Sequence, residues 1–391
     1  MFSQRTPANL TRNRLTGALD GLRRQGRGFI DLTLSNPTQA RFDYPPGLLD
    51  ALAEPGGSVY RPEPRGLRSA RDAVAMDYAR RGMRVSSDRV VLTASTSEAY
   101  SLLFKVLCDP GDDVLVPRPS YPLFEHLTRL DAVAARPYAL EYHGTWSADM
   151  TSIERAVTDR SRALLMVSPN NPTGSYVQTQ ELDAVAALCR ARGMALIVDE
   201  VFAEYELTPG AIAKHAQALD RDDVLVCSLG GLSKSAGLPH VKLGWMILNG
   251  PDDLVEGALE RIDFAADAYL SVSTPVQHAA LTLIHGGALV RHQIQQRVIG
   301  NLEQLRARVA ATPSCRLLSA DGGWYAVVRV PTLMPEEDLV LRLLTEDRVL
   351  VHPGYFFDFA AESFLVVSLL PEPALFLEGV SRVCDRFDRA A

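Results

Sequence analysis

Residues 162–201, RALLMVSPNNPTGSYVQTQELDAVAALCRARGMALIVDEV, contain a complete strand–loop–helix–strand unit. The apolar run at 162–167 is short and ends in SPNNPTG, which is typical of a buried strand followed by a turn. Residues 179–193 then place apolar side chains at helical spacing, and residues 195–201 return to a short apolar run. Two buried strands joined by a helix predict parallel strands in a sheet that is covered by helices on both faces.

The same alternation extends on both sides of this unit, from about residue 90 to about residue 250. Repeated strand–helix units of this kind predict an α/β fold. Past about residue 270 the pattern changes to one long helical stretch and two separated β-runs, WYAVVRV and FLVVSLL. This change predicts a second, smaller α+β domain. The first 45 or so residues are Pro-rich and weakly periodic, and we expect them to wrap around the body.

Length, charge and cysteine content narrow the class of protein. A chain of 391 residues is expected to form two or perhaps three domains, which is compatible with an enzyme. Its 40 basic and 47 acidic residues give a net charge of −7, so we expect no nucleic-acid partner and no attraction to a membrane surface. Five scattered cysteines, no signal-peptide core and no stretch long enough to span a bilayer predict a cytoplasmic protein.

Polar side chains follow the ends of five predicted strands, where the loops of a parallel sheet bind ligands. They comprise hydroxyls at a helix start, an aromatic ring, an amide, a carboxylate and a lysine: Thr96 and Ser97, Tyr121, Asn171, Asp199 and Lys234. Most have an ordinary structural explanation as a helix cap, a core cover or a turn. Asp199 is less easily explained, because a carboxylate that follows four apolar residues needs a partner if it is buried.

Lys234 lies in SLGGLSKSAGLPHVKLGW, residues 228–245, directly after an apolar run. A nucleotide-binding phosphate loop needs Gly before its Lys, whereas Ser233 stands there, so we set that interpretation aside. Taken together, the five strand ends supply what pyridoxal 5'-phosphate requires. These requirements are a lysine for an imine, a carboxylate for the ring nitrogen, a helix start for the phosphate, a stacking ring and an amide for the ring hydroxyl.

Six segments, in this order, resemble class I/II aminotransferases of the aspartate aminotransferase superfamily, which are fold-type-I pyridoxal phosphate enzymes. They are YRPEPRGLRSARDAVAMDYARRG (60–82), LTASTSEAY (92–100), GDDVLVPRPSYP (111–122), SPNNPTG (168–174), VDEVF (198–202) and LSKSAGLPHVKLGW (232–245). The resemblance implies a large pyridoxal phosphate-binding α/β domain at 46–285, with a mostly parallel seven-stranded sheet between helices. It implies a small α+β domain made of residues 1–45 and 286–391.

The resemblance also implies how the cofactor is held. Lys234 becomes the Schiff-base lysine and proton shuttle, and Asp199 becomes the partner of the pyridine nitrogen. Asn171 becomes the contact to the ring hydroxyl and Tyr121 the stacking aromatic. Thr96 and Ser97 fall where the N-terminus of a family helix meets the phosphate.

Further roles follow for residues outside the strand ends. Tyr60 aligns with a tyrosine that usually reaches the phosphate from the partner subunit, which implies a homodimer with shared active sites. Asn36 lies in SNPTQARF, the segment that falls where the family closes over its substrate, and we expect Asn36 and Asn171 to contact the substrate.

Three positions near the lysine depart from the family pattern. Lys242 stands where an arginine usually binds the phosphate, so the charge is kept and the forked geometry is lost. Gly231 replaces a usual hydroxyl, and Ser228 or Ser235 is the expected substitute. Phe202 stands where a tyrosine usually donates to the ring hydroxyl.

The fourth departure concerns the substrate. Val366 aligns with the arginine that usually holds the substrate α-carboxylate, and a valine cannot bind a carboxylate. Either another cation takes over, with Arg329, Arg41 and Arg118 as candidates, or the substrate is an amine without a carboxylate there. Arg329 is also well explained as an exposed residue of an edge strand.

Three hypotheses about function follow. The first is an aminotransferase that moves an amino group between an amino acid or amine and a keto acid through a Schiff base on Lys234. The alternative is a lyase or decarboxylase on the same fold, because the cofactor serves several bond cleavages. A regulator that senses a ligand with such a body would need a DNA-binding module, and residues 1–45 are too short and insufficiently basic to supply one.

Overall fold

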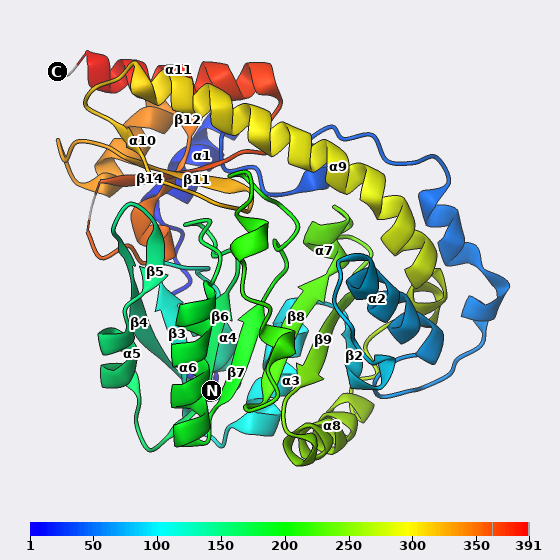
Figure 1. The fold of residues 1–391 in the computed structure, drawn as a ribbon. Coiled ribbons are helices and arrows are strands. Elements are labelled where there is room, and N and C mark those ends of the chain that lie inside the picture. Colours follow the sequence, from blue (N-terminus) through cyan, green and yellow to red (C-terminus); the bar gives the residue numbers. More distant parts are fainter. Residues whose placement is uncertain (362, 390–391) are drawn as a thin grey trace.

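An eight-stranded sheet forms the centre of the larger part of the molecule (Figure 1). The computed structural model describes residues 1–361 and 363–389. The strand order is β2-β9-β8-β7-β6-β3-β4-β5. Their bounds are β2 Val90–Thr93, β3 Asp113–Arg118, β4 Ala134–Tyr142, β5 Trp146–Ala148, β6 Ser161–Val167, β7 Ala195–Asp199, β8 Val226–Gly231 and β9 Gly244–Asn249.

The strands between β4 and β8 are parallel, whereas β2, β9 and β5 run antiparallel to their neighbours. The mostly parallel α/β sheet predicted from the sequence is therefore confirmed. The sequence predicts seven strands, and the structure adds β5 as an eighth. This short strand pairs antiparallel with the end of β4 at the edge of the sheet, after a turn, so it belongs to no strand–helix unit.

Helices cover both faces of this sheet, as its fully buried central strands require. Alternate side chains of a strand enter different cores: Leu165 and Ile197 pack with α3, α4 and α8, whereas Leu164 and Val198 pack with α2, α5, α6 and the start of α9. The helices are α2 Arg68–Arg80, α3 Thr96–Leu107, α4 Phe124–Leu130, α5 Met150–Ala156, α6 Thr179–Arg192 and α8 Asp252–Asp267.

A smaller antiparallel sheet, ordered β10-β11-β14-β13, lies beside the large one (Figure 1). Its strands are β10 Arg316–Leu317, β11 Tyr325–Arg329, β13 His352–Pro353 and β14 Phe364–Ser368, and it packs with α1 Arg14–Arg24, α10 Glu336–Thr345 and α11 Pro373–Asp388. Near it, β1 Ile30–Asp31 pairs with β12 Val349–Leu350. Leu15, Leu32 and Phe42 share one core with residues of this sheet. The division into domains at 46–285 stays a prediction.

One long helix, α9 Thr274–Ala310, links the two parts. Its first turns, with Val276 and Leu283, pack in the core of the large sheet, and later turns, with Val290 and Leu305, pack in the core of the small sheet. Short 3-10 helices complete the secondary structure: η1 Pro37–Gln39, η2 Leu48–Ala53, η3 Pro55–Ser58, η4 Ser87–Arg89, η5 Ile212–Lys214, η6 Ala218–Asp220 and η7 Gly354–Phe357.

Within the described ranges, no helix combines the length and the apolarity that crossing a membrane requires. All five cysteines are free thiols. The cytoplasmic location stays a prediction from the sequence.

Candidate active site

A cleft opens at the carboxyl ends of β6, β7 and β8, where loops of an α/β sheet bind ligands. It brings together the residues that the sequence places at five separate strand ends: Thr96, Ser97, Tyr121, Asn171, Asp199 and Lys234 all line it. Its other lining residues are Ser35, Ser95, Phe124, Val167, Val201, Phe202, Gly231, Ser233, Leu243, Gly244 and Tyr325.

The turn that carries Lys234 is fixed through its backbone. It forms the short helix α7, Leu232–Ser235, directly after β8. Tyr205 donates its hydroxyl to the Lys234 carbonyl at 2.5 Å, and Arg291 of α9 donates to the Ser235 carbonyl at 3.0 Å. Tyr44 donates to the Gly237 carbonyl at 2.6 Å. Donors from three distant segments therefore hold the turn and leave the lysine side chain to the cleft.

The Lys234 ammonium lies against two aromatic rings. Its Nζ is 4.9 Å from the ring centre of Trp324 and 5.4 Å from that of Phe202. Burial lowers the pKa of Lys234 to about 8, and the nearby Asp199 carboxylate opposes part of that change. A larger fraction of this amine is neutral at physiological pH than for an ordinary lysine, and the neutral form is the nucleophile.

Asp199 is the last residue of β7 and is buried. Its Oδ2 accepts a hydrogen bond from the Tyr100 hydroxyl at 2.7 Å, and its Oδ1 accepts one from the Val201 N–H at 3.1 Å. Burial raises the pKa of Asp199 to about 6, although these two hydrogen bonds and the charge of Lys234 act in the opposite direction. No ion pair satisfies this carboxylate within the part of the chain that the structure describes.

The neighbouring Glu200 serves a different purpose. Its side chain contacts His215 Nε2 at 3.1 Å and accepts a hydrogen bond from Ser228 at 2.5 Å. Burial opposes the ionisation of Glu200, but His215, Arg81 and Ser228 together outweigh it and lower the pKa of the carboxyl group. Glu200 is therefore satisfied inside the protein, whereas Asp199 faces the cleft.

Two adjacent asparagines differ in the same way. Asn170 Oδ1 accepts from Ser120 at 2.7 Å, and its Nδ2 donates to Pro119 and Thr173 at 3.0 and 2.8 Å. Asn171 lines the cleft, and its buried Oδ1 has no hydrogen-bond partner among the described residues. Because unpaired buried polar atoms are costly, the Asn171 amide is the group that a ligand would satisfy.

The start of α3 forms one end of the cleft. Ser95 caps this helix by accepting from the Glu98 N–H at 3.2 Å, and Thr96 and Ser97 form its first turn. The N–H groups of a first turn have no partner inside the helix and attract anions.

Of the three serines near Gly231, Ser233 lines the cleft, whereas Ser228 and Ser235 do not. Ser228 bonds to Glu200, and Ser235 donates to the Gly231 carbonyl at 3.0 Å. A Cβ at Gly231 would lie 3.1 Å from the Gly244 Cα, so a side chain there would require β8 and β9 to move apart slightly.

Three predicted site residues do not line the cleft. Lys242 is exposed, although Leu243 and Gly244 beside it are lining residues. Asn36 caps η1, where its Oδ1 accepts from the Thr38 N–H and hydroxyl at 3.1 and 2.7 Å. Arg329 is exposed at the end of β11. Their roles toward cofactor or substrate stay predictions.

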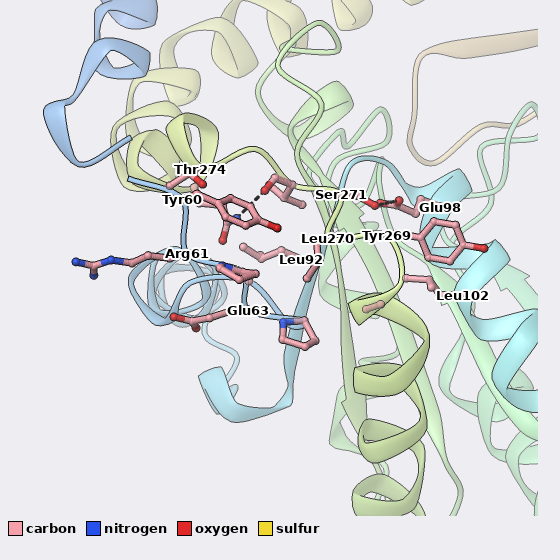
Figure 2. A pocket seen from close by; sticks show the side chains of 16 residues that line it. Tyr60, Arg61, Glu63, Leu92, Glu98, Leu102, Tyr269, Leu270, Ser271 and Thr274 are labelled. Atoms are coloured by element: carbon pink, nitrogen blue, oxygen red, sulfur yellow. Dashed lines mark hydrogen bonds between the residues drawn. The ribbon is translucent and has the colours of Figure 1, made fainter. Parts of the chain in front are cut away.

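Tyr60 lies at a second, separate pocket (Figure 2). The Tyr60 side chain is 70% exposed. This pocket is closed on another side by the loop before α9, where Ser271 donates a hydrogen bond to Glu98. Arg61 extends away from the other labelled side chains. Within its own chain, Tyr60 is thus outside the cleft around Lys234.

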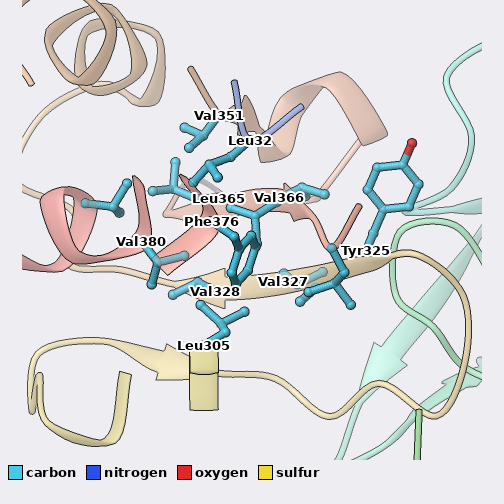
Figure 3. Packing of buried hydrophobic residues seen from close by; sticks show 14 of the residues in the cluster. Leu32, Leu305, Tyr325, Val327, Val328, Val351, Leu365, Val366, Phe376 and Val380 are labelled. Atoms are coloured by element: carbon cyan, nitrogen blue, oxygen red, sulfur yellow. The ribbon is translucent and has the colours of Figure 1, made fainter. Parts of the chain in front are cut away.

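Val366 lies in the core of the small sheet (Figure 3). It is fully buried, so neither a carboxylate nor a replacement cation meets it. Of the other candidates, Arg41 pairs with Glu372 at 3.1 Å and Arg118 with Asp358 at 3.3 Å. Among the described residues that line the cleft, Lys234 alone has a cationic side chain.

Sequence reasoning missed several residues of this site. Tyr325 begins β11 and Trp324 precedes it, and tertiary packing brings both from the small sheet to the site. Ser35 is the first residue of SNPTQARF, the segment that the resemblance places over the substrate. Tyr100 is different, because it stands four residues after Thr96 on α3. Residues four apart share a helix face, so the spacing of Thr96 and Tyr100 already indicates that Tyr100 lies near the site.

The raised pKa of Asp199 predicts a specific pH dependence of stability. Because the folded pKa lies above the unfolded value, the folded state binds the proton more tightly, and stability falls as pH rises from about 4 to about 6. Without cofactor, Asp199→Asn should gain about 3 kcal/mol over the wild type across this range. Thermal unfolding of both proteins at several pH values measures this gain. A difference between them that is independent of pH would contradict the assignment.

The family model for aminotransferase class I and II matches residues 36–382. Similar curated proteins include the glutamate-pyruvate aminotransferase AlaA of Haemophilus influenzae, which is 28% identical over 357 residues, 89% of this chain and 88% of that protein. The alanine aminotransferase of Mycobacterium tuberculosis is 28% identical over 361 residues, 90% of this chain and 83% of that protein.

A solved structure, the alanine aminotransferase from Pyrococcus furiosus, has a TM-score of 0.89 at 24% identity and covers 100% of both chains. This likeness confirms the fold that the resemblance implies. Since the family model spans most of the sequence, the chain belongs to the aminotransferase class I and II family and is an aminotransferase.

Proposed function

We propose that this aminotransferase holds pyridoxal 5'-phosphate in the cleft around Lys234 and transfers the amino group of glutamate to pyruvate, giving alanine and 2-oxoglutarate. The family implies the cofactor, and the names of the similar curated proteins support the substrates. The observation that carries the proposal is that a lysine with a lowered pKa and a buried, unpaired carboxylate open into one cleft.

The donor set of the cleft fits this cofactor. Asp199 accepts hydrogen bonds from two neutral donors, so a protonated ring nitrogen would supply the opposite charge that it lacks. Asn171 has a buried amide oxygen without a hydrogen-bond partner among the described residues, and we assign its amide to the ring hydroxyl. The first turn of α3 and Ser233 offer N–H groups and hydroxyls to a phosphate. We assign Lys242, which is exposed beside the cleft, as a further counter-charge.

Bound pyridoxal phosphate supplies an aldehyde that condenses with amines and a ring that withdraws electrons from the attached carbon. Lys234 Nζ would hold the aldehyde, and its free amine would accept the proton of the substrate Cα and return it. Phe202 and Trp324 lie against this amine, with ring centres 5.4 and 4.9 Å from Nζ. Tyr121, on the lining beside Phe124, stacks on the ring.

Substrate binding requires groups besides Lys234. We assign Asn171 to the substrate side of the ring, and Asn36 to the segment that closes over it, next to the lining residue Ser35. Arg329 would have to move toward the cleft to hold a carboxylate, since it is exposed at the end of β11. The apolar surroundings of Val366 exclude the usual position of that cation.

We propose that the protein acts as a homodimer with shared active sites. Tyr60 is exposed and lies away from the cleft of its own chain, as expected for a residue that serves the partner's site. Val59, Phe264 and Tyr269 are also large and exposed, with side chains 51%, 86% and 58% exposed, which is typical of surfaces that another chain covers.

The activity is tested by the first half-reaction. The purified protein should be yellow, and L-glutamate or L-alanine should convert it to the pyridoxamine form with release of one equivalent of keto acid. Lys234→Ala should lower kcat by at least about 10³-fold, because it removes the covalent anchor and the base. Lys105→Ala, a surface lysine that pairs with Asp131, is the matched control. Release of ammonia or CO₂ in place of a keto acid would favour the lyase or decarboxylase alternative.

Asn171→Ala and Asn170→Ala should separate ligand binding from folding. Asn170→Ala removes three hydrogen bonds inside the protein and should destabilise the cofactor-free chain by about 1–3 kcal/mol. Asn171→Ala removes an unpaired group, so it should leave that stability nearly unchanged and weaken cofactor binding about tenfold. Thermal unfolding and equilibrium dialysis measure the two effects. Equal cofactor affinity in wild type and Asn171→Ala would overturn this assignment.

Shared sites predict complementation between two impaired variants. Each dimer of Lys234→Ala with Tyr60→Ala would contain one site with both native residues. A 1:1 mixture that exchanges subunits should therefore recover about a quarter of wild-type activity, whereas each variant alone remains impaired. Activity assays after subunit exchange, with light scattering for the oligomeric state, measure this recovery. A mixture no more active than the mean of its components would rule out sharing through Tyr60.

A further inference from the structure

A buried phenol lies behind the carboxylate of the active site. Tyr100, in α3, is 1% exposed, and its hydroxyl donates to Asp199 Oδ2 at 2.7 Å. The contact joins a helix to a strand end that is 99 residues away in the chain. It occurs because Asp199 points to the same face of the sheet as Ile197, the face that α3 covers.

The ring of Tyr100 is held in place from two sides. It stacks on Phe104 at a centroid distance of 6.0 Å, and it meets Phe124 edge-on at 5.5 Å. Phe124 itself lines the cleft. The hydroxyl is thus fixed by aromatic packing and aimed at a single acceptor.

The same helix also forms the phosphate end of the cleft. Thr96 lies in the first turn of α3 and lines the cleft, and Tyr100 follows four residues later on the same face. About one helical turn, roughly 6 Å along the axis, separates these two residues. Helix α3 therefore contains the anion-binding turn at its start. Through Tyr100 it also contacts the Asp199 carboxylate, at the opposite end of the proposed cofactor.

We propose that Tyr100 is a positioning residue for the ring nitrogen of the cofactor: its hydroxyl holds the Asp199 carboxylate ionised and correctly oriented to pair with that nitrogen. The inference rests on the proposed function, because it requires pyridoxal phosphate in this cleft. The hydroxyl itself touches neither cofactor nor substrate in this arrangement.

The charges around Asp199 explain why it needs this donor. Lys234 of α7 favours its ionised form, whereas burial and the negative Glu200 beside it disfavour that form. Tyr121, after β3, also faces it, with its own pKa raised by burial and by the Asp199 charge. If Lys234 bound an aldehyde, the charge on its amine would change. The Tyr100 hydroxyl and the Val201 N–H would then be the remaining donors to the Asp199 carboxylate among the described residues.

The simpler alternative is that Tyr100 donates only to satisfy its own buried hydroxyl. Tyr138 of β4 offers a matched control for that effect. It is 2% exposed, and its hydroxyl donates to the Leu165 carbonyl at 2.8 Å, away from Asp199. Tyr100→Phe and Tyr138→Phe each remove one buried hydrogen bond of a tyrosine that lies against the same sheet.

The test compares cofactor binding by the full-length wild type, Y100F and Y138F. Affinities are measured for pyridoxal phosphate and for its 1-deaza analogue, which lacks the ring nitrogen. Y100F should bind pyridoxal phosphate about tenfold more weakly and the analogue as the wild type does. As the pH is lowered, Y100F should lose its affinity for pyridoxal phosphate at a higher pH than the wild type does. Y138F should lower thermal stability and leave the preference for the nitrogen-containing ring unchanged.

A Y100F variant that weakens both ligands equally, or that behaves as Y138F does, would overturn the proposal. So would a further loss of preference when Y100F is added to Asp199→Asn, because the carboxylate through which Tyr100 acts is then absent. A Y100F chain that does not fold would show that the hydroxyl serves the fold. If the wild type binds neither ligand, the proposed function itself is wrong, and that result is distinguishable from the others.

Discussion

The site depends on one electrostatic constraint, which is that two ionisable groups are withdrawn from water without being paired to each other. Asp199 and Lys234 open into the same cleft, and burial moves their pKa values toward each other, to about 6 and about 8. Such an arrangement costs stability, and a protein keeps it when a ligand restores the missing interactions. The cofactor that we propose for this cleft would supply both complements, an aldehyde for the amine and a basic nitrogen for the carboxylate.

The sequence predicts the mostly parallel sheet and all six strand-end residues of the cleft, because both follow from local periodicity and from the rule that parallel strands end at one edge. It does not predict β5, whose edge pairing follows no strand–helix unit. It also expects Ser228 or Ser235 to supply the hydroxyl that Gly231 lacks, whereas these two bond to Glu200 and to the Gly231 carbonyl and Ser233 lines the cleft. Which of these serine side chains enters the cleft depends on the backbone geometry of β8 and α7, and the residue pattern does not specify it.

The structure shows the surroundings of three residues that depart from the family pattern, Gly231, Phe202 and Val366. At Gly231 the close approach of β8 to β9 leaves little room, so a side chain carrying a hydroxyl would require the two strands to shift. Phe202 has no hydroxyl to donate, and its ring packs against Trp324 at a centroid distance of 5.2 Å. The Lys234 ammonium lies against both rings. Val366 belongs to a fully apolar core.

Helix α9 has a mechanical consequence. It is continuous over 37 residues and is anchored in both cores, and Arg291, midway along it, binds the backbone of the lysine turn. Gly287 allows the helix to pass so closely that a Cβ there would overlap with Ala236. A continuous helix transmits a tilt along its length, so any rotation of the small sheet toward the large one acts as a lever on the turn that presents Lys234. Such a rotation would therefore also displace the turn that carries Lys234.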